Sequence, residues 1–554
     1  MKKWTIIALI ALVILILALR GIPYMINVYL NQNADTIVSN MITRTSGFEN
    51  HHVSFGKIRL DYNYAGTYLD IEDIKIKPTE ELRLEQASFD LHLSHAKITG
   101  FKWKNFLFNN TIAIDSANLK NLLIKSITPP IDSIYLENIS EKKERKDYDL
   151  IAANHIILEN FNLENKDLQS DSTRLTIEKL SVNAENFHFT KEDISNPNSL
   201  FGAGAIHGEI DEVSLHFDEF RQKVAIQELL FDTRNQGLSI GNFSVINKLD
   251  KFPYTQAFKL RKPWLQLKEG KMDIVGMNFE SFLKKGIIEI DSLKISHIHL
   301  EVFNNKKIPE DMERRPAMVH EIFQTIQVPM AIRNTILNNG YLRVEEQPEK
   351  STPKTAHLFF SNLNAQISEL SNLENGLESN ELSLKANALL MGKGKIDLAL
   401  SYALDDSLGN FHLRGTLGQM ALSEVNTMIE PEAKVSLKSG VIKRLDFNIY
   451  ANDDDGHGEV IVRYDDLEIE LLNEDYQKDN NILRKIGSFL ASKVIIKSQN
   501  PKKNGALRKG PVYARRVKHK SMFNYWWQLI FSGLKSTVTG EELEELKAKE
   551  LQKS

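Results

Sequence analysis

Cysteine is absent from all 554 residues of the chain. That absence excludes a disulfide scaffold, thiolate metal sites and a cysteine nucleophile. It does not fix the compartment, because proteins of oxidising spaces either pair their cysteines or lack them. Hydrophobic residues make up 42% and charged residues 26% of the chain, so disorder is not indicated.

Motifs of known catalytic or metal chemistry are also missing. His320-Glu321 is not followed by the second histidine of a zinc-protease helix. Asp453–Gly456 lacks the alternating ligands of a calcium loop and favours a hairpin turn. Gly392–Lys395 lacks the spacing of a phosphate-binding loop, and there is no serine-nucleophile elbow. We therefore expect no enzymatic activity, no catalytic residue, no metal and no cofactor.

Positive charge is concentrated near the C-terminal end. The net charge is −4, yet 497–520 holds nine Lys or Arg and no Asp or Glu. Subtracting those nine charges from −4 leaves −13 on the remainder. A mildly acidic body with one short basic segment argues against nucleic acid as a partner.

The one long apolar run lies at the N-terminus. It extends from Trp4 to Leu19 without a charge, after Lys2 and Lys3 and before Arg20. Its sixteen residues span roughly 24 Å as a helix, and interfacial Trp and Arg side chains can cover the rest of a bilayer. We expect a single-pass anchor at 1–21 with its N-terminus in the cytoplasm, and its membrane contacts include Trp4, Ile7, Leu12, Leu17 and Leu19.

A cleaved signal peptide is the alternative interpretation of this run. Such peptides end in a small-x-small site, whereas the exit here reads Ala18-Leu19-Arg20-Gly21. The anchor is therefore the favoured prediction. Residues 22–47 then read as a helical segment continuing from it.

Period-two alternation dominates the chain from residue 48 to about 496. Val213-Ser-Leu215-His-Phe217 and Leu445-Asp-Phe447-Asn-Ile449 are typical examples. Such runs, bounded by Gly, Pro, Asn and Asp, are half-buried antiparallel strands. The fold class expected is mainly β: an elongated, repetitive antiparallel array forming a groove, with few short helices. One helical interruption is predicted near 315–328, from Arg315 to Gln327.

The alternation carries a recurring irregularity. Ile177-Glu-Lys-Leu180-Ser-Val182 and Ile290-Asp-Ser-Leu293-Lys-Ile295 place two residues between apolar positions instead of one. This spacing predicts a bulge or sharp corner in each strand.

Each strand has a continuous apolar face that something must cover. A closed core, a second sheet or a bound apolar ligand can do so. Too few helices are predicted for a sheet of this length. The pattern therefore leaves two possibilities open: a groove filled by acyl chains, or faces that pack on one another as a solid spacer.

The C-terminal region combines a basic approach with an aromatic helix. Residues 497–520 form the basic segment, and 521–554 form an amphipathic aromatic helix with a charged tail. Two interpretations stay open: contact with a membrane or partner, and capping of the end of the β-array. The helix face expected to do either consists of Phe523, Trp526, Trp527, Ile530, Phe531 and Leu534. The expected contacts to anionic lipid are Arg508, Lys509, Arg515, Arg516, Lys518 and Lys520.

Segments at both ends of the chain resemble the AsmA-like superfamily of Gram-negative envelope proteins, in a form similar to Bacteroidetes members. They are Val53-Ser-Phe-Gly-Lys-Ile-Arg-Leu60, Tyr68-Leu-Asp-Ile-Glu-Asp-Ile-Lys-Ile76, Ser439-Gly-Val-Ile-Lys-Arg-Leu-Asp-Phe447, Gly456-His-Gly-Glu-Val-Ile-Val-Arg-Tyr-Asp-Asp-Leu467, Lys520-Ser-Met-Phe-Asn-Tyr-Trp-Trp527 and Ser532-Gly-Leu-Lys535. The resemblance implies kinship with chorein-type bridge proteins, an inner-membrane anchor and a periplasmic β-groove that carries phospholipid for outer-membrane biogenesis and envelope integrity. It offers no catalytic motif.

The leading hypothesis is therefore a periplasmic protein anchored in the inner membrane that handles phospholipid, with other envelope proteins as further partners. A structural scaffold or assembly factor for outer-membrane proteins, which binds no lipid, is the second hypothesis. An envelope hydrolase with an unrecognised site is the third, and no histidine or aspartate is nominated for it.

Overall fold

The fold is mainly β, as predicted. A computed structural model describes residues 2–44, 48, 51–63, 66–79, 88–128, 148–196, 199–217, 219, 221–326, 328–350, 354–373, 381–404, 406, 408–478 and 497–552. Within these residues the strands form one 23-stranded sheet. The chain divides into unit 1, Met1–Gly241 with Met277–Ile287, and unit 2, Asn242–Gly276 with Ile288–Ser554. The charge run at 141–146 and the alternating residues at 82–84 lie outside the described residues.

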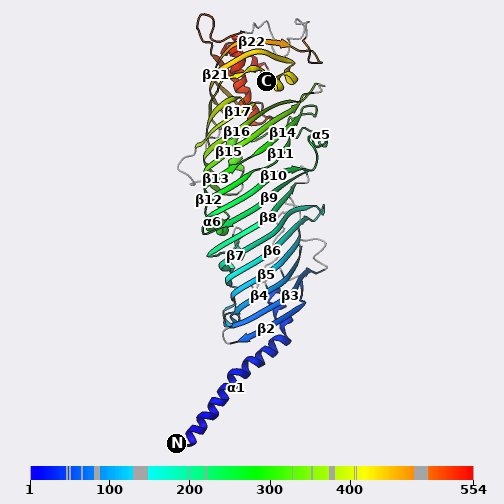
Figure 1. Cartoon of the computed structure of the whole chain (residues 1–554), viewed down its shortest axis with the longest axis vertical. Coiled ribbons are helices and arrows are strands. Elements are labelled where there is room, and N and C mark those ends of the chain that lie inside the picture. Colours follow the sequence, from blue (N-terminus) through cyan, green and yellow to red (C-terminus); the bar gives the residue numbers. More distant parts are fainter. Residues whose placement is uncertain are drawn as a thin grey trace. The chain divides into compact units, whose positions relative to one another are not determined.

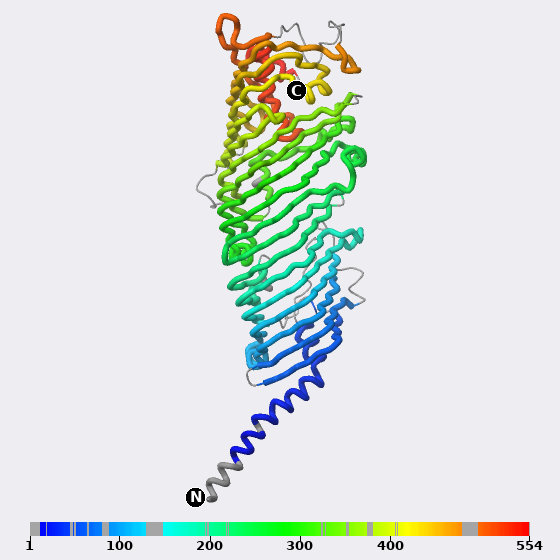
Figure 2. The backbone as a smooth tube through the Cα atoms, in the orientation of Figure 1, coloured from blue at the N-terminus to red at the C-terminus, as the bar shows by residue number. Residues whose placement is uncertain are grey.

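Unit 1 is a series of strands that mostly pair in chain order, so neighbouring strands have neighbouring colours (Figure 2). Its strands are β1 His51–Ser54, β2 Lys57–Asn63, β3 Gly66–Pro78, β4 Ser88–Phe101, β5 Thr111–Thr128, β6 Leu150–Asp167, β7 Thr173–Thr190, β8 Ala205–Phe217 and β9 Gln222–Asp232. Its helices are α1 Lys2–Gln32, α2 Ala34–Thr43, α3 Trp103–Asn109, α4 Lys191–Ser195 and α6 Phe279–Lys285. The described pairings are antiparallel except β5 with β6.

Unit 2 continues the same construction. Strands β10 Gly237–Asn247 and β12 Lys271–Met277 contribute residues to both units. The other strands are β11 Trp264–Leu267, β13 Ile288–Ser296, β14 His299–Asn305, β15 Met330–Gln347, β16 Ala356–Ser371, β17 Glu381–Leu390, β18 Gly394–Ala403, β19 Phe411–Leu417, β20 Met420–Ala421, β21 Val435–Ala451, β22 Asp455–Leu471 and β23 Gly510–Arg515. The helices are α5 Lys251–Gln256, α7 Val319–Thr325, the 3-10 helix η3 Leu422–Val425, α8 Asn426–Ala433, α9 Met522–Thr539 and α10 Leu543–Leu551. Parallel pairing occurs between β13 and β15 and between β14 and β15.

The strands of unit 1 bend where a left-handed residue interrupts the alternation. Lys179, inside the predicted irregularity Ile177–Val182, has φ +51°, and the β6–β7 register shifts beside it. The same spacing recurs around Asp73, Asn121 and Asn160, whose φ values are also positive. Asn and Asp tolerate this conformation better than other side chains with a Cβ. The predicted bulge is confirmed here.

The second predicted irregularity, at Ile290–Ile295, contains no residue with a positive φ, and the ladder to β15 omits the pair of Asp291 and Arg333 there. Ile290 pairs with Ile332 and Ile295 with Leu337, so the offset is the same at both ends of the segment. Its neighbour β15 is parallel, and both strands pass this point in step.

Two ladders of apolar side chains cross unit 1 on one face of the sheet. Paired residues on neighbouring strands lie opposite one another and share a face. The first ladder comprises Ile58, Ile71, Ala96, Leu119, Leu158, Val182, Gly208 and Phe231. The second comprises Val53, Ile76, Leu91, Ile124, Leu163, Ile177, Val213 and Ile226.

Helix α2 covers the beginning of these ladders. Val38 of α2 is buried in one cluster with Ile71 and Ile76 of β3, and Ile42 packs on the same cluster. Helix α1 meets the sheet at its edge strand β2 (Figure 1). There Asn27 and Asn31 each form a pair of hydrogen bonds with the β2 backbone.

The two asparagines take the place of a neighbouring strand. The Asn31 amide donates to the carbonyl oxygen of Leu60 at 2.6 Å and accepts from the Leu60 N–H at 3.0 Å. The Asn27 amide likewise donates to the carbonyl oxygen of Tyr62 at 3.0 Å and accepts from the Tyr62 N–H at 2.5 Å. An exposed strand edge is a template for unwanted pairing, and this clamp closes it.

We expect Asn31→Leu to open this edge. The Leu60 N–H and carbonyl would lose their partners at a cost of about 1–3 kcal/mol. Hydrogen exchange of the Leu60 and Tyr62 amides should accelerate at least tenfold in the full chain. Asn33→Leu is the control, because the Asn33 side chain, between α1 and α2, donates to the Tyr29 carbonyl of α1 and has no hydrogen bond to β2 within the described residues. Equal exchange in both variants would contradict the clamp.

Unit 2 has its main core at the C-terminal strands. Leu400, Leu413 and Ile449 form one ladder with Val512, and all four are buried. Helix α9 covers this face through Tyr525 and Leu529 (Figure 1). Strand β23 lies within 510–515, so the sheet extends past the predicted limit of 496 into the basic segment. Its alternating Val512 and Ala514 face the core, and Pro511 is compatible with a strand near the edge.

The predicted helix at 315–327 is shorter in the structure. Helix α7 begins at Val319, because Met318 is extended and its N–H donates to Glu321 Oε2 at 2.6 Å. This N-terminal capping interaction fixes the start and leaves Pro316 outside the helix. Met318 is fully buried while Ile322 is exposed, so the two do not share an environment. The Phe323 side chain lies outside the described part of the structure.

Close packing of α9 depends on Gly533. A Cβ at this position would lie 2.4 Å from Val460 Cγ2 and 2.7 Å from Val512 Cγ2. We expect Gly533→Val to lift α9 from the sheet and lower the free energy of unfolding by about 2–4 kcal/mol. Limited proteolysis and thermal unfolding of the full chain would measure this. Gln528→Val, at a half-buried position of the same helix, should cost less than about 1 kcal/mol.

Candidate functional site

Within the described residues, the buried cluster on the apolar face of unit 1 reaches from β1 to Leu119 and Leu122 of β5, and the face is less buried beyond them. Ile71, Ile76 and Ala96 are at most 3% exposed, whereas the ladder residues on β5–β9, such as Leu158, are half-buried apart from Gly208. At the edge of the same face Leu215 is 37% and Phe217 43% exposed. The buried hydrophobic clusters within the described residues involve β1–β4 in unit 1 and the C-terminal strands in unit 2. The face of β5–β9 is therefore the candidate apolar site.

The opposite face of these strands is held together by polar contacts. The Glu212 carboxylate accepts from Lys223 at 2.7 Å, from Ser214 at 2.5 Å and from Gln227 at 3.0 Å. The hydrogen bond from Lys223, followed by those from Ser214 and Gln227, lowers the pKa of Glu212 to about 2. Because Glu212 precedes Val213 of the apolar ladder, this network fixes the β8–β9 register from behind.

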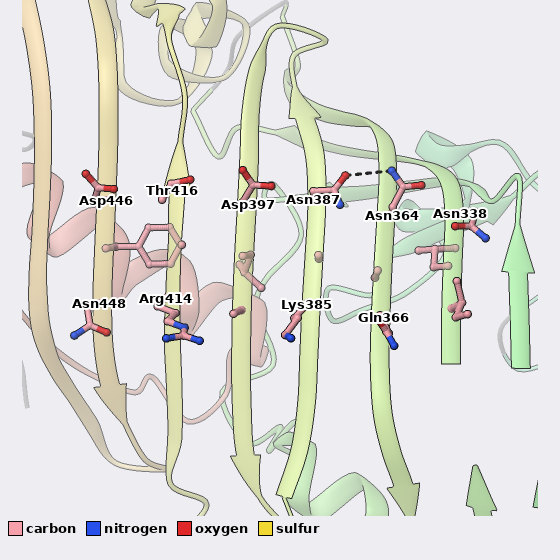
Figure 3. A pocket seen from close by; sticks show the side chains of 18 residues that line it. Asn338, Asn364, Gln366, Lys385, Asn387, Asp397, Arg414, Thr416, Asp446 and Asn448 are labelled. Carbon is pink, nitrogen blue, oxygen red and sulfur yellow. Dashed lines mark hydrogen bonds between the residues drawn. The ribbon is translucent and has the colours of Figure 1, made fainter. Parts of the chain in front are cut away.

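Unit 2 has a polar trough of about 750 Å³ on the face of β15–β19 and β21 that is opposite its core. Two rows of side chains from neighbouring strands line it (Figure 3). The first row is Asn338, Asn364, Asn387, Asp397, Thr416 and Asp446, and the second includes Gln366, Lys385, Arg414 and Asn448. Asn364 donates to Asn387 at 3.2 Å.

The floor of the trough consists of residues with their side chains on the other face. Ala365, Ala386 and Gly415 each separate two lining residues, and Gly415 pairs with Phe447. A Cβ on Gly415 would lie 2.4 Å from the Phe447 ring. The trough and the apolar core thus occupy the two sides of the same strands.

The structure places the predicted anchor in helix α1. Its segment Ala11–Gln32 is long and apolar enough to cross a membrane, the one such helix found within the described residues. Leu12, Leu17 and Leu19 are exposed, as a lipid-facing side chain would be. The side chains of Trp4 and Ile7 lie outside the described part.

The residues predicted on the aromatic face of α9 divide between two environments. Trp526, Ile530 and Leu534 pack against the buried core of unit 2. Phe523 is 63% and Trp527 52% exposed, and Trp527 stacks on Phe531 with ring centroids 5.7 Å apart. The buried face is centred on Tyr525 and Leu529, one residue away from the predicted centre. Helix α9 thus caps the sheet while presenting an aromatic edge to solvent.

Most of the basic residues predicted to contact lipid have partners inside the chain. Arg516 is buried, pairs with Asp453 and donates to the Pro316 carbonyl at 2.6 Å. Lys518 Nζ lies 2.6 Å from Asp453 and 2.8 Å from Asp454. The carboxylates of the Asp453–Gly456 turn therefore bind cationic side chains.

The other four basic residues are less deeply placed. Arg508 donates to the Thr537 carbonyl at 3.2 Å, and Lys509 pairs with Glu459 at 3.1 Å. Lys520 lies 3.9 Å from Glu310, and Arg515 is exposed. Five of the six basic residues thus have partners within the described residues, and Arg515 is exposed to solvent.

The sequence analysis did not identify the trough. Its signal is a triplet in which a short or buried residue separates two polar ones: Asn364-Ala-Gln366, Lys385-Ala-Asn387, Arg414-Gly-Thr416 and Asp446-Phe-Asn448. Each triplet alone is an ordinary solvated strand face. Only their alignment across paired strands reveals the two rows.

No protein-family model matches this sequence, and a search of curated proteins finds no match. Within the described residues, no group of three or more His, Asp or Glu side chains is arranged to hold a metal ion.

Glu212 makes the stability of β8–β9 depend on pH. Its folded pKa of about 2 lies below the ordinary glutamate pKa of 4.5, so its contribution to stability is present above pH 4.5 and is lost as the pH falls toward 2. Glu212→Gln should therefore lower the local stability at pH 7 by roughly 2 kcal/mol and by much less near pH 2. Hydrogen exchange of the β8 and β9 amides measures this. Glu209→Gln, at an exposed position of β8, should show no such pH dependence.

Proposed function

We propose that this chain is a membrane-anchored, non-enzymatic protein that handles phospholipid, with acyl chains bound on the apolar face of β5–β9. One observation carries the proposal: two mainly aliphatic ladders continue across unit 1, whereas the buried cluster under α2 reaches, within the described residues, only from β1 to Leu119 and Leu122 of β5. The resemblance to AsmA-like proteins supports the same function. It implies an anchor in the inner membrane, a sheet in the periplasm and a route for the lipid to the outer membrane.

The size of the uncovered face suits an acyl chain. Strands lie about 4.8 Å apart, so the four spacings from β5 to β9 cover roughly 19 Å. One leaflet of a bilayer holds hydrocarbon over about 15 Å, half of the 30 Å core. One extended acyl chain can thus lie across the ladders and remain in contact with aliphatic side chains along its length.

The energy of burial also favours an apolar ligand. When a ligand completes the burial of a half-buried Leu, Ile or Val, the complex gains roughly 1 kcal/mol or less. This is half or less of the gain from burying a fully exposed side chain. Rows containing Leu158, Val182, Ile177 and Val213 therefore offer several kcal/mol to a chain that displaces water. A soluble protein rarely leaves such a continuous face open.

The anchor holds this face beside the membrane. Asn27 and Asn31 fasten helix α1 to β2, and the ladders begin on that strand and on β1. A lipid leaving the bilayer near α1 meets the ladders at their first strands. Helix α2 lies over those strands, so the lipid reaches the uncovered part beyond α2.

Crosslinking in native membranes tests the proposal. A photoreactive amino acid at Val182 should label phospholipid, because Val182 lies on the apolar ladder between Leu158 and Gly208. The matched position is Asn183, which faces the other side of β7 and pairs with Ile157 and His207. We expect lipid adducts at Val182 to exceed those at Asn183 at least tenfold.

A second pair of variants tests the role of the ladder. Val182→Asp should abolish lipid adducts from a photoreactive residue at Ile177, while Asn183→Asp should leave them unchanged. Protein adducts in place of lipid at both ladder positions would support the scaffold hypothesis. Equal lipid labelling on the two faces would refute a specific apolar site.

A further inference from the structure

The short helix α3 of unit 1 presents an apolar face to solvent. Leu107 is 65% exposed, and Phe108 is 78% exposed, the highest value among the large apolar side chains of the described residues. Lys104 is exposed as well. These three residues are spaced i, i+3 and i+4, so they share one face of the helix. The outward face of α3 thus combines two large apolar side chains with one cation.

The inward face of α3 fixes the helix to unit 1. The Trp103 indole N–H donates to Thr67 Oγ1 at 2.7 Å, and the ring packs against the buried cluster that contains Leu30 of α1. The Phe106 ring lies against Tyr148, with centroids 6.1 Å apart. These contacts hold the helix by one side and leave its outward face exposed.

The clamp between α1 and β2 shows how the first strands lie along the anchor. Asn31 binds Leu60, and Asn27 binds Tyr62, so β2 runs antiparallel to α1 and toward its apolar run. Four residues of a helix rise about 6 Å and two residues of a strand about 7 Å, so the two elements advance in step. The end of β2 therefore lies near Tyr24.

Helix α3 lies at this same end of β2. Strand β3 begins at Gly66, which pairs with Asn63, the last residue of β2. A Cβ on Gly66 would lie 3.0 Å from Gly100 Cα, and the next residue, Thr67, binds Trp103 at the start of α3. All these residues belong to unit 1. The helix is therefore level with the part of α1 that follows the apolar run.

The residues of α1 at this level are suited to a membrane interface. Tyr24 is 71% and Tyr29 64% exposed, and tyrosine is enriched where hydrocarbon meets water. Tyr24 follows the last residue of the apolar run, Leu19, by a helical rise of about 7.5 Å. Each headgroup region of a bilayer is about 5–8 Å thick. An α1 that crosses the membrane therefore brings α3 to the headgroups.

We propose that Leu107 and Phe108 insert into the surface of the bilayer that α1 crosses, with Lys104 among the headgroups. Interfacial helices place Leu and Phe at the acyl boundary and Lys in the polar layer in this way. A single helix leaves the body free to rotate about the helix axis, whereas α1 and α3 together set the inclination of unit 1. The inference rests on the anchoring by α1 in the proposed function, and not on lipid binding by β5–β9.

Fluorescence quenching in reconstituted vesicles tests this contact. The chain has no cysteine, so Phe108→Cys introduces a single site for an environment-sensitive fluorophore. The full chain is placed in vesicles of phosphatidylethanolamine and phosphatidylglycerol, with or without phospholipid that carries a spin label on its acyl chain. Spin-labelled lipid should quench the fluorophore at position 108 at least about threefold more than one at an exposed position remote from the membrane.

Two further positions calibrate the measurement. Leu230→Cys is the matched control, because Leu230 is an exposed leucine, 47% accessible, on β9 of the same unit. Seven strand spacings separate β9 from β2, or roughly 34 Å. Leu17→Cys lies in the apolar run and reports the anchor itself. Its fluorophore should be quenched strongly.

A charged variant tests the insertion directly. Leu107→Asp should reduce quenching at position 108 at least about twofold, because a carboxylate does not enter the acyl region. Leu230→Asp should leave it unchanged. Both leucines are exposed, so the two variants should unfold at the same temperature as the parent chain.

The outcomes separate this contact from the rest of the proposed function. Quenching at position 17 with none at position 108 would overturn the α3 contact alone. Absence of quenching at both positions would refute the anchor and the α3 contact with it. Lipid crosslinking at Val182 tests the acyl site of β5–β9 independently of either result.

Discussion

The structure depends on one constraint: a sheet built from period-two strands has an apolar face that must be removed from water. Each strand contributes few residues to that face, but the ladders join them across eight strands in unit 1. Helix α2 meets the constraint at the first strands and α9 at the last ones. The helices are short relative to the sheet, so cover is local. The function then depends on what covers the apolar face of β5–β9. The proposed acyl chains would remove this face from water without any further protein segment.

Alternation was enough to predict the fold class, because a repeat of two reports extended backbone with one buried face. It also located the corner at Lys179, where two polar residues separate apolar neighbours. The identical spacing at Ile290–Ile295 contains no left-handed residue, although the parallel pair β5–β6 keeps a constant offset across Asn121 and Asn160, which are both left-handed. The spacing of apolar residues alone therefore does not decide where a strand turns a corner. The start of α7 was misplaced for a similar reason: the contact between Met318 and Glu321 outweighs the helical pattern that begins at Arg315.

The candidate sites were predictable to different extents. Hydropathy identified the apolar face and the anchor helix directly. The lipid-contact role predicted for Arg516 and Lys518 rested on charge alone, and charge does not show that Asp453 and Asp454 already balance these cations. The buried face of α9 is centred one residue away from the predicted face, on Tyr525 and Leu529, which that prediction did not include. In the structure Tyr525 is buried beside Gly456. A larger residue at position 456 would collide with Leu529 and crowd the Tyr525 hydroxyl.

The trough and the apolar core constrain each other through a shared backbone. Gly415 lies in the trough floor, and on the core side the Phe447 ring occupies the space that a Cβ there would need. Ala365 and Ala386 continue the same ladder with small side chains. Small residues on this ladder let the core side pack closely, and on the other side they separate the paired polar residues of each strand. A substitution that enlarges Gly415 would therefore disturb Phe447 first and the trough second. Because the core and the trough share these backbone positions, a change of side chain on one face there alters the other face as well.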